Sequence, residues 1–151
     1  MEEAYEDSVE EIKRAEHLFY VSLKYTRTVD VIRSFIDRLV GSFDYGMLCL
    51  LKYAKEKKKI KDIPVTPIAR CQLVEKTFED INIKEYIDFY LLFRRLLRAP
   101  YTKREEYRRH VTMTSDIDGK PTEVNIDISK EYYDKTIDFL KLVSATARPK
   151  K

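Results

Sequence analysis

Two residues of this chain have side chains whose chemistry could cleave RNA without a metal ion. Arg104 and His110 are separated by five residues within a stretch rich in positive charge. A neutral histidine can accept the proton of a ribose 2′-hydroxyl, and a guanidinium group can hold the phosphate and stabilise its developing charge. The competing interpretation is that His110 closes a helix or faces the solvent amid a basic surface.

A basic segment, residues 94–110, contains this pair. The net charge of the chain is only +3, so the segment is a local feature and does not reflect the composition as a whole. Arginines beside aromatic side chains are a recurring pattern in the recognition of single-stranded RNA, where the arginines hold phosphates and the rings stack on bases. We expect this segment to bind RNA or a nucleotide through Arg94, Arg95, Arg98, Lys103, Tyr107, Arg108 and Arg109.

Other kinds of site lack their motifs. The chain has no glycine-rich phosphate loop, no Cys-x-x-Cys and no His-Glu-x-x-His. The two histidines, His17 and His110, are too few for a histidine-rich metal site, and neither follows a glutamate by three positions as in di-iron bundles. We therefore expect no metal and no cofactor, although a cofactor-binding bundle enzyme is a third hypothesis. Cys49 and Cys71 lie far apart in apolar segments and are predicted to be buried thiols.

The composition indicates where such a protein works. No amino-terminal stretch resembles a signal peptide and no apolar run reaches about 18 residues, so we expect a cytoplasmic protein without a membrane segment. One glutamine and two asparagines beside many Lys, Glu and Arg residues are typical of a thermophile, and we expect a thermophilic archaeon as the source.

Long helices must position the basic segment, because the chain has only three glycines and five prolines. Apolar residues recur at helical spacing, and cap residues mark where helices begin. We predict a single domain over residues 1–151, mainly all-α, formed by an antiparallel bundle of four to five helices. The expected starts are Ser8, Thr28 with the first helical residue Val29, Thr66-Pro67, Asn82, and Ser129.

The segment before the last helix has a different pattern. Thr102 and Glu105 have the form of a capping box, so Lys103–Arg109 is predicted as one or two helical turns. Alternating residues then predict two short strands, Val111–Ser115 and Thr122–Ile126, joined at Asp118-Gly119 as one short β-hairpin insertion. In the second helix, Gly41 and Gly46 predict a kink or a close helix crossing.

The order of the helices, with a basic element between the late ones, resembles the HEPN superfamily (higher eukaryotes and prokaryotes nucleotide-binding). The resemblance runs from Ala15-Glu16-His17-Leu18-Phe19 to the last helix, Tyr132-Tyr133-Asp134-Lys135-Thr136-Ile137-Asp138-Phe139-Leu140. Catalytic members carry an arginine, four to six residues, and a histidine, which Arg104 and His110 match. The resemblance implies a homodimer that brings two such motifs together, or an inactive partner of a nucleotidyltransferase.

Two functions follow from these patterns. The favoured one is a HEPN-like helical-bundle interaction module that binds RNA or a nucleotide through residues 94–110. The alternative is a metal-independent endoribonuclease in which Arg104 and His110 are catalytic. Both require the arginines and the imidazole to lie together on an open surface.

Overall fold

The computed structural model describes residues 1–148, which form a bundle of five helical rods and one small sheet. The first rod is continuous and consists of α1, a π-helical turn over Leu18–Ser22, and α2. A 3₁₀ turn over Glu79–Ile81 separates α4 from α5. The elements are α1 (Glu2–His17), α2 (Leu23–Tyr25), α3 (Val29–Glu56), α4 (Pro67–Thr77), α5 (Lys84–Arg98), β1 (Tyr101–Arg104), β2 (Thr112–Ile117), β3 (Lys120–Val124) and α6 (Ile126–Ala147).

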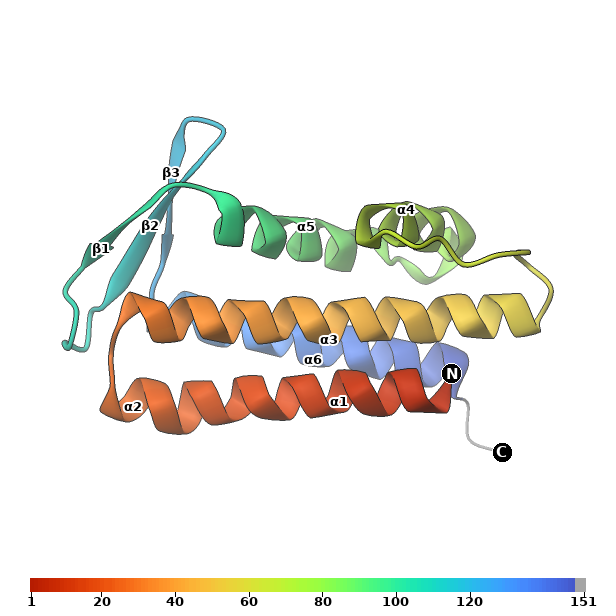
Figure 1. Cartoon of the computed structure of the whole chain (residues 1–151), viewed down its shortest axis with the longest axis horizontal. Helices are drawn as coiled ribbons and strands as arrows, with labels where there is room; N and C mark the ends of the chain where they lie inside the picture. The colour runs from red at the N-terminus through yellow and green to blue at the C-terminus, as the bar shows by residue number, and fades with distance from the viewer. Residues whose placement is uncertain (149–151) are drawn as a thin grey trace.

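The long helices alternate in direction, which confirms the antiparallel bundle (Figure 1). Helix α3 is central and packs on α1, α4, α5 and α6. Helices α4 and α5 follow one another along α3 on the side opposite to α1, and the sheet lies at the end where α2 turns into α3. The start of α6 therefore lies beside the sheet, and Arg148 pairs with Glu2 at the other end.

Aromatic side chains fill the centre of the bundle. Phe43 of α3 stacks on Phe139 of α6 with ring centroids 4.4 Å apart, and it meets Phe93 of α5 edge-on at 5.9 Å. All three rings are buried. A β-carbon on Gly46 would lie 2.7 Å from the Phe139 ring, so glycine is needed for this approach. The predicted close crossing is confirmed at Gly46.

Two predicted helix starts are confirmed. The hydroxyl of Thr28 accepts a hydrogen bond from the Val31 N–H at 3.3 Å and caps α3. The hydroxyl of Thr66 caps α4 by accepting from the Ala69 N–H at 3.2 Å, with Pro67 as the first helical residue.

Three predicted starts are wrong, since none of these residues caps a helix. Ser8 lies buried within α1, where its carbonyl accepts a hydrogen bond from the Ser42 hydroxyl of α3 at 3.0 Å. Asn82 has a left-handed backbone, with φ of 56°, and follows the 3₁₀ turn without capping α5. Ser129 is in the first turn of α6, and the cap is Asn125.

The helical turns predicted over Lys103–Arg109 are also wrong. Residues Tyr101–Arg104 form a strand that pairs antiparallel with β2, with Lys103 opposite Met113. The two-stranded hairpin is thus a three-stranded sheet in the order β1-β2-β3. The turn at Asp118-Gly119 is confirmed, since both residues have positive φ as a two-residue hairpin loop requires.

Both cysteines are buried, as predicted, and burial raises the pKa of each thiol to about 11. The sequence also predicts a loose basic tail at Arg148-Pro149-Lys150-Lys151, of which residues 149–151 lie outside the described part of the chain. Over residues 1–148, the structure has no helix whose length and apolar character would let it span a bilayer.

A buried polar chain joins α3 to α5. The hydroxyl of Tyr90 donates a hydrogen bond to the Asp44 carboxylate and accepts one from Arg94 at 3.3 Å. Burial raises the pKa of Asp44 above its ordinary value of 3.8, while the Tyr90 hydrogen bond and the Arg94 charge oppose that shift. The protonated carboxyl is therefore favoured by the folded protein more than by the unfolded chain.

We expect Gly46→Ala to lower the free energy of unfolding by about 1–3 kcal/mol, because the clash with Phe139 exceeds the gain in helix propensity of about 1 kcal/mol. Gly41→Ala is the matched control, since its β-carbon would meet only the flexible Glu11 side chain, and it should leave stability unchanged or raise it. Urea unfolding of both variants measures this. Equal stabilisation by the two alanines would contradict the close packing at Gly46.

Asp44→Asn should become more stable relative to the natural chain as the pH rises. The pKa of Asp44 is higher in the folded protein than in the unfolded chain, so the folded protein binds this proton more tightly. The contribution of Asp44 to the free energy of unfolding therefore falls as the pH rises from 3.8 to beyond the folded pKa. Asparagine still accepts from Tyr90 but does not ionise. Urea unfolding at pH 4 and pH 8 should show the difference between the variants growing with pH, and a constant difference would contradict the assignment. Asp44→Ala, which leaves the buried Tyr90 hydroxyl without its acceptor, should cost about 1–3 kcal/mol at both pH values.

Candidate functional site

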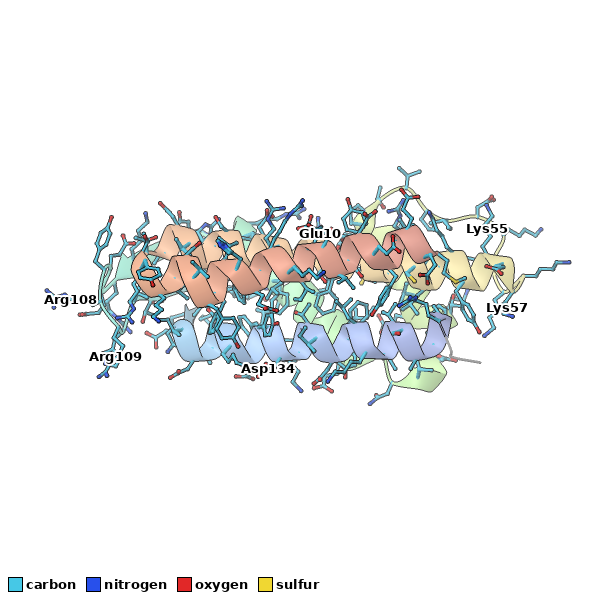
Figure 2. All side chains as sticks on the ribbon, turned by 90° about the horizontal axis from the view of Figure 1, so that it is seen from below. Glu10, Lys55, Lys57, Arg108, Arg109 and Asp134 are labelled. Carbon is cyan, nitrogen blue, oxygen red and sulfur yellow. The ribbon has the colours of Figure 1, made fainter. Side chains whose placement is uncertain are left out.

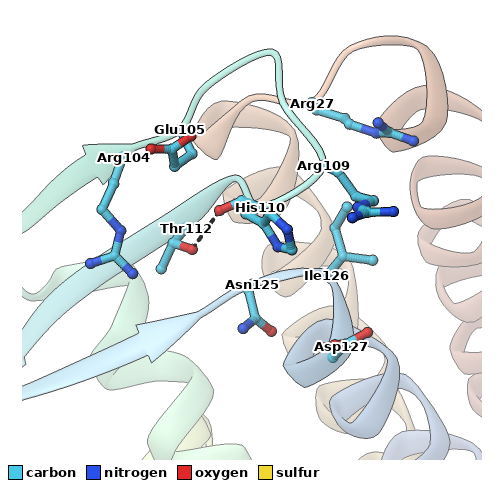
Figure 3. A pocket seen from close by; sticks show the side chains of 9 residues that line it. All are labelled: Arg27, Arg104, Glu105, Arg109, His110, Thr112, Asn125, Ile126 and Asp127. Atoms are coloured by element: carbon cyan, nitrogen blue, oxygen red, sulfur yellow. Dashed lines mark hydrogen bonds between the residues drawn. The ribbon is translucent and has the colours of Figure 1, made fainter.

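A pocket of about 510 Å³ opens where the sheet meets the bundle (Figure 3). Three separate parts of the chain form it: the turn between α2 and α3, the end of β1 with the loop that follows, and the start of α6. Its lining is rich in cationic and hydrogen-bonding groups and consists of Arg27, Arg104, Glu105, Arg109, His110, Thr112, Asn125, Ile126 and Asp127.

The loop between β1 and β2, residues 105–111, is called the site loop here, and two hydrogen bonds tie it to the bundle. The Glu106 carboxylate accepts from the Val29 N–H at 2.9 Å, and the Tyr107 N–H donates to the Arg27 carbonyl at 2.6 Å. Val29 is the first residue of α3, so its N–H has no partner within the helix, and a negative charge is favourable there. These contacts bring Arg27 and the site loop together.

The backbone of the site loop is tightly turned. Glu105 and Tyr107 have φ of 57° and 64°, a left-handed conformation that residues other than glycine rarely adopt. The Arg108 N–H donates to the Glu105 carbonyl at 3.2 Å, and the N–H of the buried Val111 donates to the Arg108 carbonyl at 3.1 Å. Together with the two bonds to the bundle, these contacts hold the loop in its strained form.

Asn125 and Thr112 complete the opposite wall. The Asn125 side-chain oxygen accepts from the Ile128 N–H at 2.8 Å to cap α6, so the side-chain nitrogen is left as a donor for a ligand. The Thr112 hydroxyl donates to the His110 carbonyl at 2.8 Å and fixes the backbone that carries the imidazole. The positive end of the 22-residue α6 also favours an anion here, while Asp127 in its first turn opposes that effect.

The cationic groups of the pocket are incompletely neutralised. Arg104 pairs with Glu123 at 2.7 Å, but both side chains are more than half exposed, so the pair contributes at most about 1 kcal/mol and can be exchanged for a ligand. Glu105 lies 3.8 Å from Arg108. In the described part of the chain, Arg109 has no ion pair, and the buried Arg27 Nε has no hydrogen-bond partner.

Three of the residues singled out in the sequence line this pocket, namely Arg104, Arg109 and His110. In Figure 3, His110 and Arg109 lie above the first turn of α6, and Thr112 lies between His110 and Arg104. The open surface required of the basic segment is therefore present for these three residues.

The remaining predicted residues lie elsewhere. Arg94 contacts Tyr90 inside the bundle, Arg95 pairs with Asp118 of the hairpin, Lys103 pairs with Asp30 at 3.3 Å, and Arg98 is exposed near the end of α5. Arg108 and the 77% exposed Tyr107 are at the same end of the molecule as the pocket but do not line it. Figure 2 shows Arg108 and Arg109 at one end of the bundle and Lys55 and Lys57 at the other.

Arg27, Thr112 and Asn125 were missed by the sequence reasoning. Nothing in the sequence around Arg27 indicates that the site loop folds back onto it. Asn125 carried a usable signal, because an asparagine directly after a strand and three residues before an apolar position is a typical helix cap.

Among the side chains that the structure describes, which leave out Asp80 and residues 149–151, no three His, Cys, Asp or Glu residues are grouped so that they could hold a metal ion. Comparison of the chain with models of known protein families, with curated proteins and with solved structures found no match.

Proposed function

We propose that this protein is a HEPN-like interaction module that binds the phosphate of RNA or of a nucleotide in the pocket of Arg27, Arg104, Arg109 and His110. The observation that supports the proposal is that three arginines and one histidine line a single open pocket. Two of these side chains, Arg27 and Arg109, keep donors without a carboxylate partner among the described residues.

The size and the donors of the pocket suit one nucleotide unit. A volume of about 510 Å³ falls in the range of small-molecule sites, whereas a duplex would need a broad surface. Guanidinium groups can bind phosphate oxygens through two parallel hydrogen bonds, and the Asn125 side-chain nitrogen can donate one more. An unpaired strand fits such a pocket because its nucleotides can be splayed apart.

A second candidate function is supported by one observation, that Arg104 and His110 line the same pocket. In a metal-independent endoribonuclease, the ribose 2′-oxygen would attack the adjacent phosphorus and His110 would take its proton. The bond to the 5′-oxygen of the next nucleotide would break, and this leaving oxygen would take a proton from water. The products would be a 2′,3′-cyclic phosphate and a 5′-hydroxyl end. Arg104 would stabilise the charge on the phosphate oxygens. The homodimer and the nucleotidyltransferase partner stay predictions of the resemblance.

Arg27→Ala and Arg109→Ala should each weaken binding of a labelled single-stranded RNA by about 10-fold or more, as expected when a charged hydrogen-bonding group is removed. Arg27 holds the site loop through its backbone carbonyl, so Arg27→Ala removes the side chain but leaves this contact in place. Lys57→Ala, at the opposite end of the bundle, is the charge-matched control.

Fluorescence anisotropy at several salt concentrations measures both the affinity and the slope of log K against log salt. The magnitude of that slope should fall by about 0.7 for each phosphate that the variant no longer neutralises. Equal weakening by all three variants would contradict a specific site.

Cleavage should be tested on single-stranded RNA in EDTA. If the nuclease function holds, cleavage persists in EDTA, His110→Ala lowers the rate at least about 100-fold, and the variant still binds RNA. A substrate with a single 2′-deoxy position should resist cleavage at that position, which identifies the attacking oxygen. If the natural protein leaves RNA intact both in EDTA and with added divalent metal, the proposed nuclease function is wrong. The proposed binding function is not affected by that result.

A further inference from the structure

A second, smaller pocket adjoins the one described above. It has a volume of about 200 Å³ and is lined by Phe19, Tyr20, Leu23, Lys24, Arg27 and Ile126. Arg27 and Ile126 line both pockets, so the two pockets are neighbours at these side chains. The first pocket presents charged and hydrogen-bonding groups, whereas the second presents two aromatic rings and two aliphatic side chains with cationic groups beside them.

The aromatic pocket is formed by the π-helical turn of the first rod. Phe19 and Tyr20 lie within this turn, and none of its five residues is buried. Wide turns of this kind occur often at functional sites. Tyr20 keeps 49% of its surface exposed. The turn thus leaves aromatic surface open next to the cationic pocket.

Two neighbouring aromatic rings contact the ring of Tyr20, but neither of them is stacked on it. It meets Phe19 at 4.9 Å with an interplanar angle of 80°, and Tyr133 at 6.2 Å with an angle of 90°. Tyr133 is itself fixed by a hydrogen bond from its hydroxyl to Glu16 at 2.9 Å. Both aromatic contacts are close to perpendicular, so neither neighbouring ring is stacked in parallel on Tyr20.

We propose that this aromatic pocket is a nucleobase subsite, in which a base stacks on Tyr20 while the phosphate of the same or the next nucleotide lies against Arg27, Arg109 and His110. The inference rests on the proposed phosphate-binding function and adds the part of the ligand that the first pocket does not hold. Arg27 lines both pockets and can contact the base edge or the phosphate.

Size and charge favour a nucleobase over a segment of a partner protein. The volume suits one planar ring system and is too small for a helix, and the neighbouring cations suit a ligand that is negatively charged on one side and flat on the other. Stacking on an aromatic side chain accepts any base, so we expect little preference among the four bases. A free nucleotide and one residue of an RNA strand present the same chemistry here.

The experiment compares ribose 5-phosphate, AMP and a short oligoadenylate RNA by calorimetry. The natural chain should bind AMP about 10-fold or more tightly than ribose 5-phosphate, since only AMP carries the base. Tyr20→Ala should remove this difference while its affinity for ribose 5-phosphate stays within about two-fold of the natural chain, and Tyr20→Phe should keep the difference. Tyr25→Ala is the matched control, because Tyr25 is 79% exposed in the same rod and does not line the pocket.

The outcomes separate the two proposals. Equal affinity for AMP and ribose 5-phosphate in the natural chain, or a preference that survives in Tyr20→Ala, would overturn the base subsite and leave the phosphate pocket intact. Failure of all three ligands to bind would overturn both. Where AMP binds more tightly than ribose 5-phosphate, the base subsite is supported. An affinity for AMP at least equal to that for the oligonucleotide then indicates a free nucleotide, and a weaker one indicates RNA.

Discussion

The hydrogen bond from the Val29 N–H to the Glu106 carboxylate is the contact on which the candidate site depends. The N–H groups at the start of a helix need acceptors, and α3 obtains one from a loop 77 residues later in the chain. The same contact holds the site loop against the turn that carries Arg27, and so brings Arg27, Arg109 and His110 to one pocket. A requirement of helix termini therefore determines where the cationic side chains lie.

The helix starts and the turn that sequence reasoning predicted correctly depend on partners only a few residues away. Thr28 and Thr66 cap helices through N–H groups three residues ahead, and Asp118-Gly119 forms a turn by its own backbone preference. Ser8 and Ser129 have the same side chain that caps helices elsewhere, but each is buried inside a helix that begins earlier. The strand at Tyr101–Arg104 was missed because it forms by pairing with β2, and its local pattern resembled a capped helix.

The residues of the candidate site also divide into those that the sequence predicted correctly and those that it did not. Arg104, Arg109 and His110 could be chosen from their types and spacing, and they line one pocket. Arg94, Arg95 and Arg98 were equally suitable candidates in the sequence, but successive residues of a helix point in different directions. Arg94 therefore faces the buried Tyr90, and Arg95 reaches the hairpin. Tyr20 gave no signal beyond its residue type, because its exposure depends on the π-helical turn.

Because the pocket combines residues near positions 27, 104–112 and 125–127, no short fragment of the chain can contain it. Contacts between residues so far apart in the sequence carry a large loop-closure entropy and form only when the chain has largely collapsed. The pocket is therefore a marker of complete folding. A ligand bound there would raise the melting temperature of the whole bundle with increasing concentration, since it binds the native state and not the unfolded chain.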